Sequence, residues 1–585
     1  MGAIIRSEYP RPDRVRAAWQ TLNGQWDFAF DQGKVGHKEK WYRSFPAQCK
    51  IEVPFAYQSE LSGVENKDHC DVVWYSRKFT MGEDLAACRR LLHFGAVDYK
   101  AEVWLDGQFL GVHEGGYTPF TFDITDLTEG KGEYTLTVCC EDRLDFDQPR
   151  GKQSYRPEPF ACWYTPVTGI WQSVWLEGVG DVYAEDFRLT PCVENSSVKV
   201  EVSLNEKPQA GQVRLTVSFD GKLSAQQLIT VTTDRFVQTE IYLRHDEELE
   251  GIHMWSPSNP ALYDLKIETL EDGKVIDSVD TYFGMRKIEI VNGHILLNRN
   301  VLTQKLILDQ GYWPDGLLTA PSDDALRKDV ELTLAMGYNG ARKHQKFEDP
   351  RYLYWADKLG LLVWGELPSA YWLRDSQKRN MMRDLSEAIR RDYNHPCLIT
   401  WVPINESWGV PFIETQKEAQ QLAEALYHIV HSLDGTRLVS GNDGWENAAT
   451  DIVTVHDYTA WPEQLSTDYN SESTLLFGNP GSSRMASAQG YDFSGKPKLL
   501  TEYGGIAMQK DEGNGNWGYN GAVHDEKAFL ERFEAITQAF KHMPGFSGYC
   551  YTQLTDVFQE VNGLLDMNRN PKASIDEIRR INQQR

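Results

Sequence analysis

The chain has 585 residues, of which 41% are hydrophobic and 25% charged, a composition typical of globular proteins. Its formal net charge of −25 disfavours nucleic acid as a partner, because an acidic surface repels a polyanion. No apolar run reaches about 18 residues, so neither a transmembrane helix nor a membrane partner is predicted. The 18 Trp, 27 Tyr and 24 Phe suit sugar-facing surfaces, although aromatic cores are the commoner explanation.

The amino-terminal segment and the cysteines bear on cellular location. Residues 1–20 carry several arginines among polar residues and no apolar segment typical of a secretory signal. The nine cysteines are scattered without CxxC spacing, which predicts neither a zinc site nor a disulfide framework. A cytoplasmic protein with reduced thiols is the simpler expectation, although a chain that has lost its signal would look the same.

Residues 1–180 alternate short strands with turns and show no useful length of helical periodicity. Trp74–Phe79 is one predicted strand, and Ala101–Leu110 is a predicted hairpin with Asp106-Gly107 at its turn. This pattern predicts an all-β sandwich with jelly-roll connectivity.

Residues 181–287 are also predicted to be all β but differ in character. Alternating strands such as Val198–Leu204 and Gln212–Phe219 recur at about immunoglobulin spacing. Few His, Asp or Trp residues cluster at their ends, so we assign this immunoglobulin-like β-sandwich a spacer role.

From residue 288 to residue 585 the pattern changes to alternating strands and helices, which predicts a (β/α)8 TIM barrel. The predicted strands are Leu302–Leu308, one led by residues 338–341, Leu361–Trp364, Cys397–Ile404, Leu438–Ser440, Ile452–Val455, Lys498–Thr501 and Gly548–Leu554. The predicted helices are Asp323–Met336, Asp349–Leu359, Met381–Tyr393, Lys417–Leu433, residues 526–542 and Ile575–Ile581.

Two predicted barrel strands deliver a glutamate at their ends. Glu406 follows the buried run Cys397–Ile404, and Glu502 follows Lys498–Thr501. Each could simply cap the helix or loop that follows it. However, TIM-barrel active sites lie at the carboxyl ends of the strands, and paired carboxylates split glycosidic bonds. The position of these two strand-end glutamates therefore favours catalysis over capping.

At this point the chain resembles glycoside hydrolase family 2, which includes β-galactosidases, β-glucuronidases and β-mannosidases. Gly115–Phe120 and Gly169–Val174 resemble motifs of the family's sugar-binding domain. Asn405-Glu406 resembles its acid/base motif, and residues 501–504 (Thr-Glu-Tyr-Gly) resemble its nucleophile motif. Each motif is short, but together they occur in order over nearly the whole chain.

The resemblance implies a retaining mechanism through a covalent glycosyl-enzyme. Glu502 would be the ionised nucleophile. Glu406 would be the acid/base, for which we expect a raised pKa. Asn405 resembles the family residue that hydrogen-bonds the sugar 2-hydroxyl. Tyr503 and Tyr458 are candidates to orient Glu502, with core packing as the alternative for either tyrosine.

Polar and aromatic side chains at other strand ends are expected to line a sugar pocket. A lone histidine there is often only structural. The further candidates are Asp309, Gln310, Trp313, Arg342, Lys343, His344, Glu366, His456, Asp457, Tyr551 and Gln553, with Trp163 reaching over the pocket from the jelly-roll loop, as that loop does in relatives.

The sequence departs from the family where the sugar is chosen. The family's glucuronidases carry an Asn-x-Lys near strand eight that grips the sugar carboxylate, whereas this chain has Asn562-Gly563-Leu564. The metal ligands of the largest β-galactosidases cannot be mapped, so no metal and no other cofactor is predicted. Arg342 and Lys343 still offer positive charge for a carboxylate, or serve to tune nearby acids.

The favoured hypothesis is a retaining exo-β-glycosidase acting on a terminal galacto-configured sugar, either a β-D-galactoside or a β-D-galacturonide. An axial 4-hydroxyl would be held by Asp309 or His344. The alternatives are β-glucuronidase, another exo-β-glycosidase of the family, or a catalytically inactive carbohydrate-binding protein. The expected partner is a small carbohydrate or glycoconjugate, and a homo-oligomer is left open.

Overall fold

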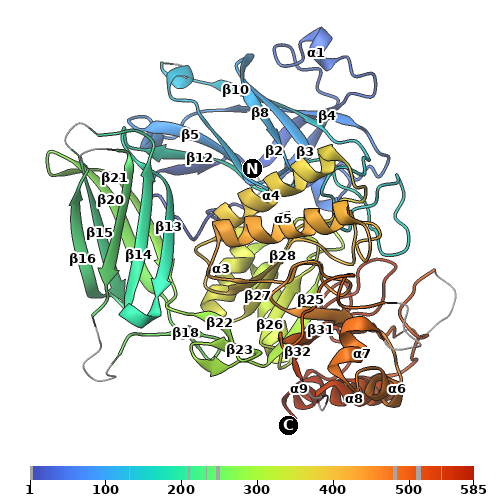
Figure 1. Ribbon diagram of the computed structural model, residues 1–585. Helices are drawn as coiled ribbons and strands as arrows, with labels where there is room; N and C mark the ends of the chain where they lie inside the picture. Colours follow the sequence, from blue (N-terminus) through green and yellow to red (C-terminus); the bar gives the residue numbers. More distant parts are fainter. Residues whose placement is uncertain are drawn as a thin grey trace.

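Figure 1 shows the computed structural model, in which two β-sandwiches and a barrel are joined in chain order. It describes residues 4–130, 132–208, 211–231, 234–244, 251–478, 484–508, 515–541, 543 and 545–584. The first sandwich lies at the top of the view, the second at the left, and the barrel at the lower right.

The first sandwich packs a six-stranded sheet on a four-stranded sheet, both antiparallel. The larger sheet has the order β3-β2-β4-β10-β7-β8, and the smaller has β1-β12-β5-β9. Alternating apolar residues form the core between them, with Trp26, Tyr75 and Leu92 at most 1% exposed. The bounds are β1 Trp19–Thr21, β2 Gly24–Phe30, β3 Cys49–Val53, β4 Val72–Phe79, β5 Arg89–Phe94, β6 Val97–Asp98, β7 Lys100–Leu105, β8 Gln108–Glu114, β9 Phe120–Asp123, β10 Tyr134–Glu141, β11 Gly169–Ile170 and β12 Val174–Val179.

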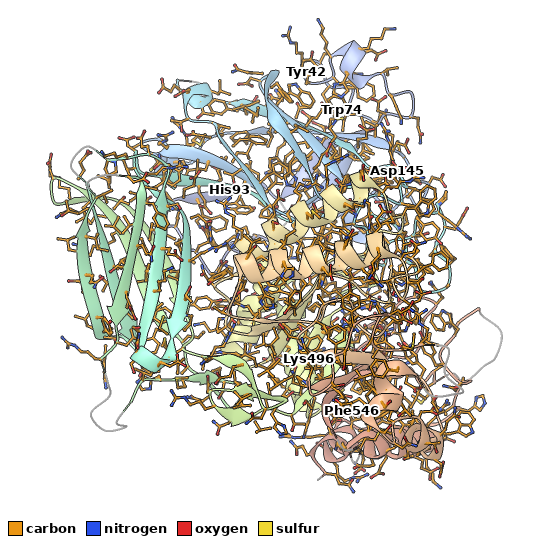
Figure 2. All side chains as sticks on the ribbon, in the orientation of Figure 1. Tyr42, Trp74, His93, Asp145, Lys496 and Phe546 are labelled. Atoms are coloured by element: carbon orange, nitrogen blue, oxygen red, sulfur yellow. The ribbon has the colours of Figure 1, made fainter. Side chains whose placement is uncertain are left out.

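A smaller aromatic cluster covers the outer face of the larger sheet beneath α1 (Gly36–Glu39). Trp104 stacks on Trp74, with ring centroids 5.4 Å apart, and on Tyr42, with ring centroids 5.1 Å apart. Figure 2 labels Trp74 and Tyr42 in this part of the molecule. This cluster is an example of the aromatic core packing that was the commoner explanation for the aromatic content.

The second sandwich has a three-stranded sheet, β13-β14-β17, and a four-stranded sheet, β16-β15-β20-β21. Its antiparallel strands alternate buried and half-buried residues, as in β15. The bounds are β13 Ala184–Cys192, β14 Ser197–Leu204, β15 Gly211–Phe219, β16 Lys222–Thr230, β17 Phe236–Tyr242, β18 Trp255–Ser256, β19 Asn259–Pro260, β20 Tyr263–Glu271 and β21 Lys274–Phe283.

The barrel is a curled eight-stranded parallel sheet in the order β29-β28-β27-β26-β25-β32-β31-β30. The strands are β25 Gln304–Asp309, β26 Gly340–Lys343, β27 Leu362–Glu366, β28 Leu398–Val402, β29 Leu438–Val439, β30 Val453–His456, β31 Lys498–Gly504 and β32 Phe546–Thr552. The helices are α2 Asp323–Ala335, α3 Pro350–Leu359, α4 Asp375–Asp392, α5 Lys417–Leu433, α6 Pro462–Asp468, α7 Glu472–Phe477, α8 Glu526–Lys541 and α9 Ile575–Gln583.

The architecture confirms the predicted jelly-roll sandwich, second sandwich and TIM barrel. Several bounds differ from the prediction: α4 begins at Asp375 rather than Met381, because the polar first turns carry no apolar stripe. Residue 542, the predicted end of a helix, lies outside the described residues. The short helices α6 and α7 and the small sheet β22–β24 (Ile288–Val291, His294–Leu297, Asn300–Val301) were not predicted.

No strand of a sandwich sheet crosses residue 180 or residue 287 among the described residues, since β12 ends at Val179, β13 begins at Ala184 and β21 ends at Phe283. We propose domains at 1–180, 181–287 and 288–585 on this ground. None of the helices in the described part of the chain combines the length and apolar character needed to cross a bilayer.

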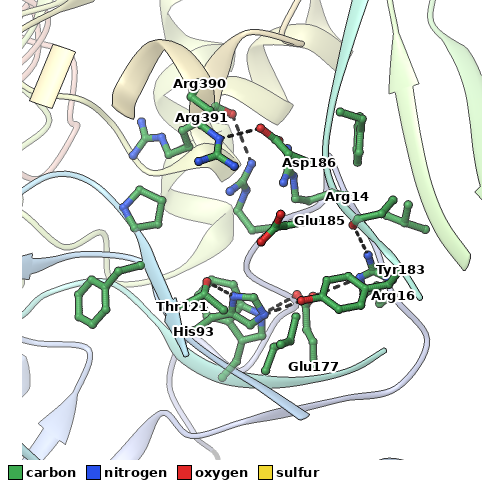
Figure 3. Close-up of a pocket in the computed structure, with 18 of the residues that line it drawn as sticks. Arg14, Arg16, His93, Thr121, Glu177, Tyr183, Glu185, Asp186, Arg390 and Arg391 are labelled. Atoms are coloured by element: carbon green, nitrogen blue, oxygen red, sulfur yellow. Dashed lines mark hydrogen bonds and ion pairs between the residues drawn. The ribbon is translucent and has the colours of Figure 1, made fainter. Parts of the chain in front are cut away.

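Ion pairs join the three units around a cavity of about 440 Å³ (Figure 3). Arg16 donates to Asp277 of the second sandwich at 2.5 Å and lies 3.5 Å from Glu177 of the first. Arg390 on barrel helix α4 donates to Asp186 on β13 at 2.7 Å. The Arg16 pairs are buried, whereas Arg390 is exposed and its partner Asp186 is half-buried. Together these pairs connect the sandwiches to the barrel and help to position the loops that reach the carboxyl ends of its strands.

Candidate active site

The carboxyl ends of β28, β30 and β31 bring three titratable side chains together. Ligand atoms of Glu406, His456 and Glu502 all lie within 4.8 Å of one another. Parallel strands end at one edge of the sheet, so residues far apart in sequence meet there. The sequence predicted this meeting of the two strand-end glutamates.

Glu502 is held from two sides. Arg342 Nη1 donates to its Oε1 at 3.0 Å, and the Tyr458 hydroxyl donates to its Oε2 at 2.5 Å. These two donors fix the orientation of the carboxylate. The Glu502 side chain is 7% exposed, so water competes little with these bonds.

Arg342, from β26, is fully buried, and its guanidinium N–H groups are all directed to partners inside the protein. Its Nε donates to Glu366 at 2.8 Å and lies 2.9 Å from Asp443, while Nη2 donates to Asn405 at 2.6 Å. With Nη1 on Glu502, no group of this guanidinium faces outward. The geometry matches the tuning role that the sequence left open, and it leaves no donor for a substrate carboxylate.

Glu406 accepts a hydrogen bond from His456 Nδ1 at 2.8 Å. Burial alone would raise the pKa of Glu406, but the bond and charge of His456, followed by Lys152 and Arg342, bring the pKa below its ordinary value. Burial lowers the pKa of His456, but Glu502, Asp443 and Glu406 raise it to about 9. The raised pKa expected for Glu406 is therefore not found, because the hydrogen bond and charge of His456 outweigh the effect of burial.

Asn405 has one open donor. Its Oδ1 accepts from Arg342, while Nδ2 is buried without a hydrogen-bond partner in the described structure. A buried unpaired amide costs about 1–3 kcal/mol, which a ligand hydroxyl would recover. The backbone at Glu406 and Ser407 has φ of 50° and 59°, a turn that projects the Glu406 side chain from the strand end.

A loop of the first sandwich closes over the strand ends. Gly151 NH bonds the Ser369 carbonyl at 3.0 Å, and the Trp163 indole donates to the Tyr371 hydroxyl at 2.6 Å. This matches the expected reach of Trp163 over the barrel. The Trp163 ring also meets Trp408 edge-on at 5.4 Å, next to Glu406.

The same loop brings Lys152, which the sequence analysis missed. It is half-buried and forms no ion pair within 4.0 Å in the described residues. Burial alone would lower its pKa, but Cys162 and Glu560 raise it, as do the two strand-end glutamates, so the net pKa is above the ordinary value. Lys152 is thus a cation in the electrostatic field of the site.

Glu560, also missed, belongs to a polar chain behind strand eight. Gln310 Nε2 donates to Gln553 at 2.7 Å, Gln553 donates to Asn562 at 2.7 Å, and Asn562 donates to Glu560 at 3.1 Å. Tyr164, from the first sandwich, donates to the other oxygen of Glu560 at 2.5 Å. Gln553 therefore lies inside this network, where it links Gln310 to Asn562.

His344 and Glu366 stand beside Arg342. His344 Nδ1 lies 3.1 Å from Glu366 and 3.9 Å from Glu502. Burial, then Lys152 and Arg342, hold the pKa of His344 well below its usual range, so the ring is neutral. Burial raises the pKa of Glu366 to about 7 despite the attraction of Arg342.

Four predicted pocket residues have other partners. Asp309 accepts from Lys343 at 2.7 Å and is 1% exposed, so it anchors that lysine instead of facing a sugar. The centroid of the Trp313 ring lies 5.2 Å from Lys346 Nζ and 4.7 Å from Arg569 Cζ. Tyr503 bonds Thr537 and packs edge-on against Tyr551, both fully buried. Core packing, the alternative named for Tyr503, describes it and Tyr551.

Asp443 is a further missed residue. It follows β29, pairs with Arg342 and accepts from Thr501 Oγ1 at 2.6 Å. The strand-end rule would have found it, whereas nothing in the sequence singles out Lys152 or Tyr164. Glu406, His456 and Glu502 could geometrically hold a metal ion, but their ligand atoms already bond one another, Arg342 and Tyr458.

Comparison with known proteins identifies the family. Models described as "Glycosyl hydrolases family 2" match in three parts: the sugar binding domain at 19–176, a middle segment at 182–286 and the TIM barrel domain at 319–584. The solved structure of Ruminococcus gnavus beta-glucuronidase superposes with a TM-score of 0.79 over 99% of this chain and 100% of that one, at 17% identity, which shows the shared fold.

Curated relatives carry two kinds of name. A putative beta-glucuronidase of Formosa agariphila is 29% identical over 68% of this chain, and a beta-galactosidase of Thermoanaerobacter pseudethanolicus is 27% identical over 64%. The chain spans about half the length of these two, 48% and 49%. A beta-glucuronidase of Paenibacillus borealis is 23% identical, with 97% of both chains covered. On the three matching segments, the chain belongs to glycoside hydrolase family 2.

Proposed function

We propose that this protein is a retaining exo-β-glycosidase with Glu502 as nucleophile and Glu406 as acid/base. The observation that carries the proposal is the distance of at most 4.8 Å between carboxylate oxygens of Glu406 and Glu502. Retaining enzymes place their carboxyl groups about 5–5.5 Å apart, whereas inverting enzymes leave about 6.5–9.5 Å for a water molecule.

In the first step Glu502 attacks the anomeric carbon and forms a C–O bond as the glycosidic C–O bond breaks. Arg342 and Tyr458 orient the carboxylate for this attack. The leaving oxygen takes a proton from Glu406. In the second step Glu406 takes a proton from water, the water oxygen bonds the anomeric carbon, and Glu502 departs as a carboxylate.

The proton for the first step is stored on the Glu406–His456 pair. His456 Nδ1 lies 2.8 Å from Glu406 and has a pKa of about 9, so it is protonated at neutral pH. Transfer along this bond gives a neutral histidine and a protonated Glu406. The two groups titrate as one coupled unit, which reconciles the lowered pKa of Glu406 with its role as an acid.

For the sugar we propose a terminal galacto-configured residue, neutral or oxidised at C6. His344 supports it: the ring is neutral, and Nε2 has no hydrogen-bond partner in the described structure, which leaves it open to a sugar hydroxyl. Lys152 supports the oxidised form, since it is a cation without an ion-pair partner there. Glu560 opposes it, because a second carboxylate nearby would be repelled.

A β-glucuronidase is the second candidate, favoured by the names of relatives such as the Paenibacillus borealis protein, which matches over 97% of its length. A panel of nitrophenyl β-galactoside, β-galacturonide, β-glucuronide, β-glucoside and β-mannoside separates the two. We expect the highest kcat/KM for a galacto-configured substrate. A tenfold lead of glucuronide or mannoside would overturn the sugar assignment.

Proton NMR of the first-formed product tests the mechanism separately. We expect the β anomer of the released sugar, followed by slow mutarotation. An α product would exclude the retaining route. Absence of turnover on every sugar of the panel would favour the catalytically inactive carbohydrate-binding alternative.

A further inference from the structure

A second hollow opens on the outer side of Glu406. It has a volume of about 340 Å³ and is lined by Glu406, Tyr371, Trp408, Phe412, Trp445 and Arg484, among others. The Glu406 side chain is 20% exposed, against 7% for Glu502, so the acid/base faces this opening while the nucleophile lies deeper. The hollow is therefore on the side where a protonated leaving group departs.

Its walls are aromatic. Tyr371 and Trp408 meet edge-on with ring centroids 5.4 Å apart, and Trp163 packs against both from the first sandwich. On another side the Arg484 guanidinium lies 3.8 Å over the Trp445 ring, where an ion pair with Glu446 at 2.7 Å holds it. The rings are thus fixed in place by neighbours before any ligand arrives.

Phe412 stands at the opening and is 65% exposed. Its backbone has φ of 55°, a left-handed conformation that a bulky residue rarely adopts. Holding an exposed phenylalanine in this conformation costs free energy and gains no core packing. Such strain concentrates at ligand sites, which makes Phe412 a second, independent indication of a bound apolar group.

We propose that this hollow binds the leaving group and selects a planar aromatic one, a phenol-type aglycone of about two fused rings. The proposal rests on the proposed function, since it uses Glu406 as the acid that protonates the departing oxygen. The volume of about 340 Å³ is roughly twice that of a cavity of about 150 Å³ that accepts one benzene ring.

A second sugar fits less well than an aromatic ring system. Sugars need several polar partners around the ring in addition to a stacking face. Here Ser407 Oγ already accepts from Asn442 at 3.0 Å, and Arg484 already donates to Glu446. Among the remaining lining residues Glu414 offers a carboxylate, and the others offer mainly ring and backbone surface, so stacking is the main source of affinity.

The test uses 1-thio-β-glycosides of the sugar that the panel identifies, as competitive inhibitors whose sulfur link resists the general acid. Methyl, phenyl and 2-naphthyl thioglycosides and a thio-linked disaccharide share one sugar and differ only in the group beyond Glu406. We expect the Ki to fall at least tenfold from methyl to naphthyl, with the disaccharide near the methyl compound. Equal Ki values, or tightest binding of the disaccharide, would overturn the proposal.

Variants connect the effect to the hollow. Phe412→Ala and Trp445→Ala should each reduce the naphthyl-to-methyl ratio at least threefold. Phe109→Ala removes a phenylalanine that is 53% exposed on β8 of the first sandwich, and it should leave the ratio unchanged. An unaltered ratio in both hollow variants would also overturn the proposal. If the wild-type protein cleaves no glycoside and binds no thioglycoside, the proposed function itself has failed, which is a different outcome.

Discussion

At the scale of single residues, the proposed reaction gives different roles to Glu502, the nucleophile, and Glu406, the acid/base. Glu502→Gln should lower kcat/KM by about 10³-fold or more, because the covalent route disappears while the shape is kept. Glu406→Ala should spare the first step for substrates with good leaving groups, and added azide should restore turnover and yield a β-glycosyl azide. Near-normal turnover by the Glu502 variant would contradict the assignment.

His456 sets the pH dependence. Its pKa is raised to about 9, so the proton that it shares with Glu406 is present below that pH and is lost above it. The alkaline limb of kcat/KM should therefore fall near pH 9 in the wild type. His456→Gln removes the histidine that stores the proton, so the limb should move to lower pH. A limb at the same pH in both proteins would show that another group carries the proton.

At the scale of elements, the loop at residues 142–168 completes the site from another domain. Gly151 has φ of 62°, and a Cβ there would lie 2.2 Å from the Gln345 carbonyl oxygen, next to His344. Gly151→Ala should displace the loop and lower kcat/KM at least tenfold, mainly through KM. The measurement is steady-state kinetics on the best panel substrate.

Gly130→Ala is the matched control for the loop variant. Gly130 also has positive φ, at 75°, but a Cβ there meets nothing within 4 Å. Its replacement should cost about 1–2 kcal/mol of unfolding free energy from the left-handed backbone alone and leave kcat/KM unchanged. Equal kinetics for the two alanine variants would mean that the loop does not shape the site.

At the scale of the whole molecule, buried charges lock the sandwiches together around the cavity of Figure 3. Arg16→Met leaves Asp277 without its bonds at 2.5 and 2.6 Å and should destabilise the protein by about 3–5 kcal/mol. The check is the midpoint of urea unfolding. Arg235→Met removes an ion pair in which the guanidinium lies 3.9 Å from the Glu185 carboxylate and both side chains are exposed. It should lower the free energy of unfolding by only about 0–1 kcal/mol. Similar shifts of the unfolding midpoint in both variants would contradict the view that the buried Arg16–Asp277 pair holds the two sandwiches together.

Much of this molecule follows from local patterns in the sequence. Strands and helices alternate after residue 288 because each buried strand needs an apolar run and each covering helix needs an apolar stripe. That alternation is enough to bring Glu406 and Glu502 to one edge, since parallel strands all end there. The family motifs add the proposed roles of these two residues.

Only the tertiary structure decided which residues of one domain reach the site in another, and which charged groups pair with each other. Lys152 and Tyr164 reach the barrel from a sandwich loop, which no local pattern encodes. Asp309 and Arg342 pair with buried groups, and His456 lowers the pKa of Glu406, because pairing and burial set pKa values only once the chain is packed. The sequence by itself determined which residues stand at the strand ends, and packing determined which of them face a ligand.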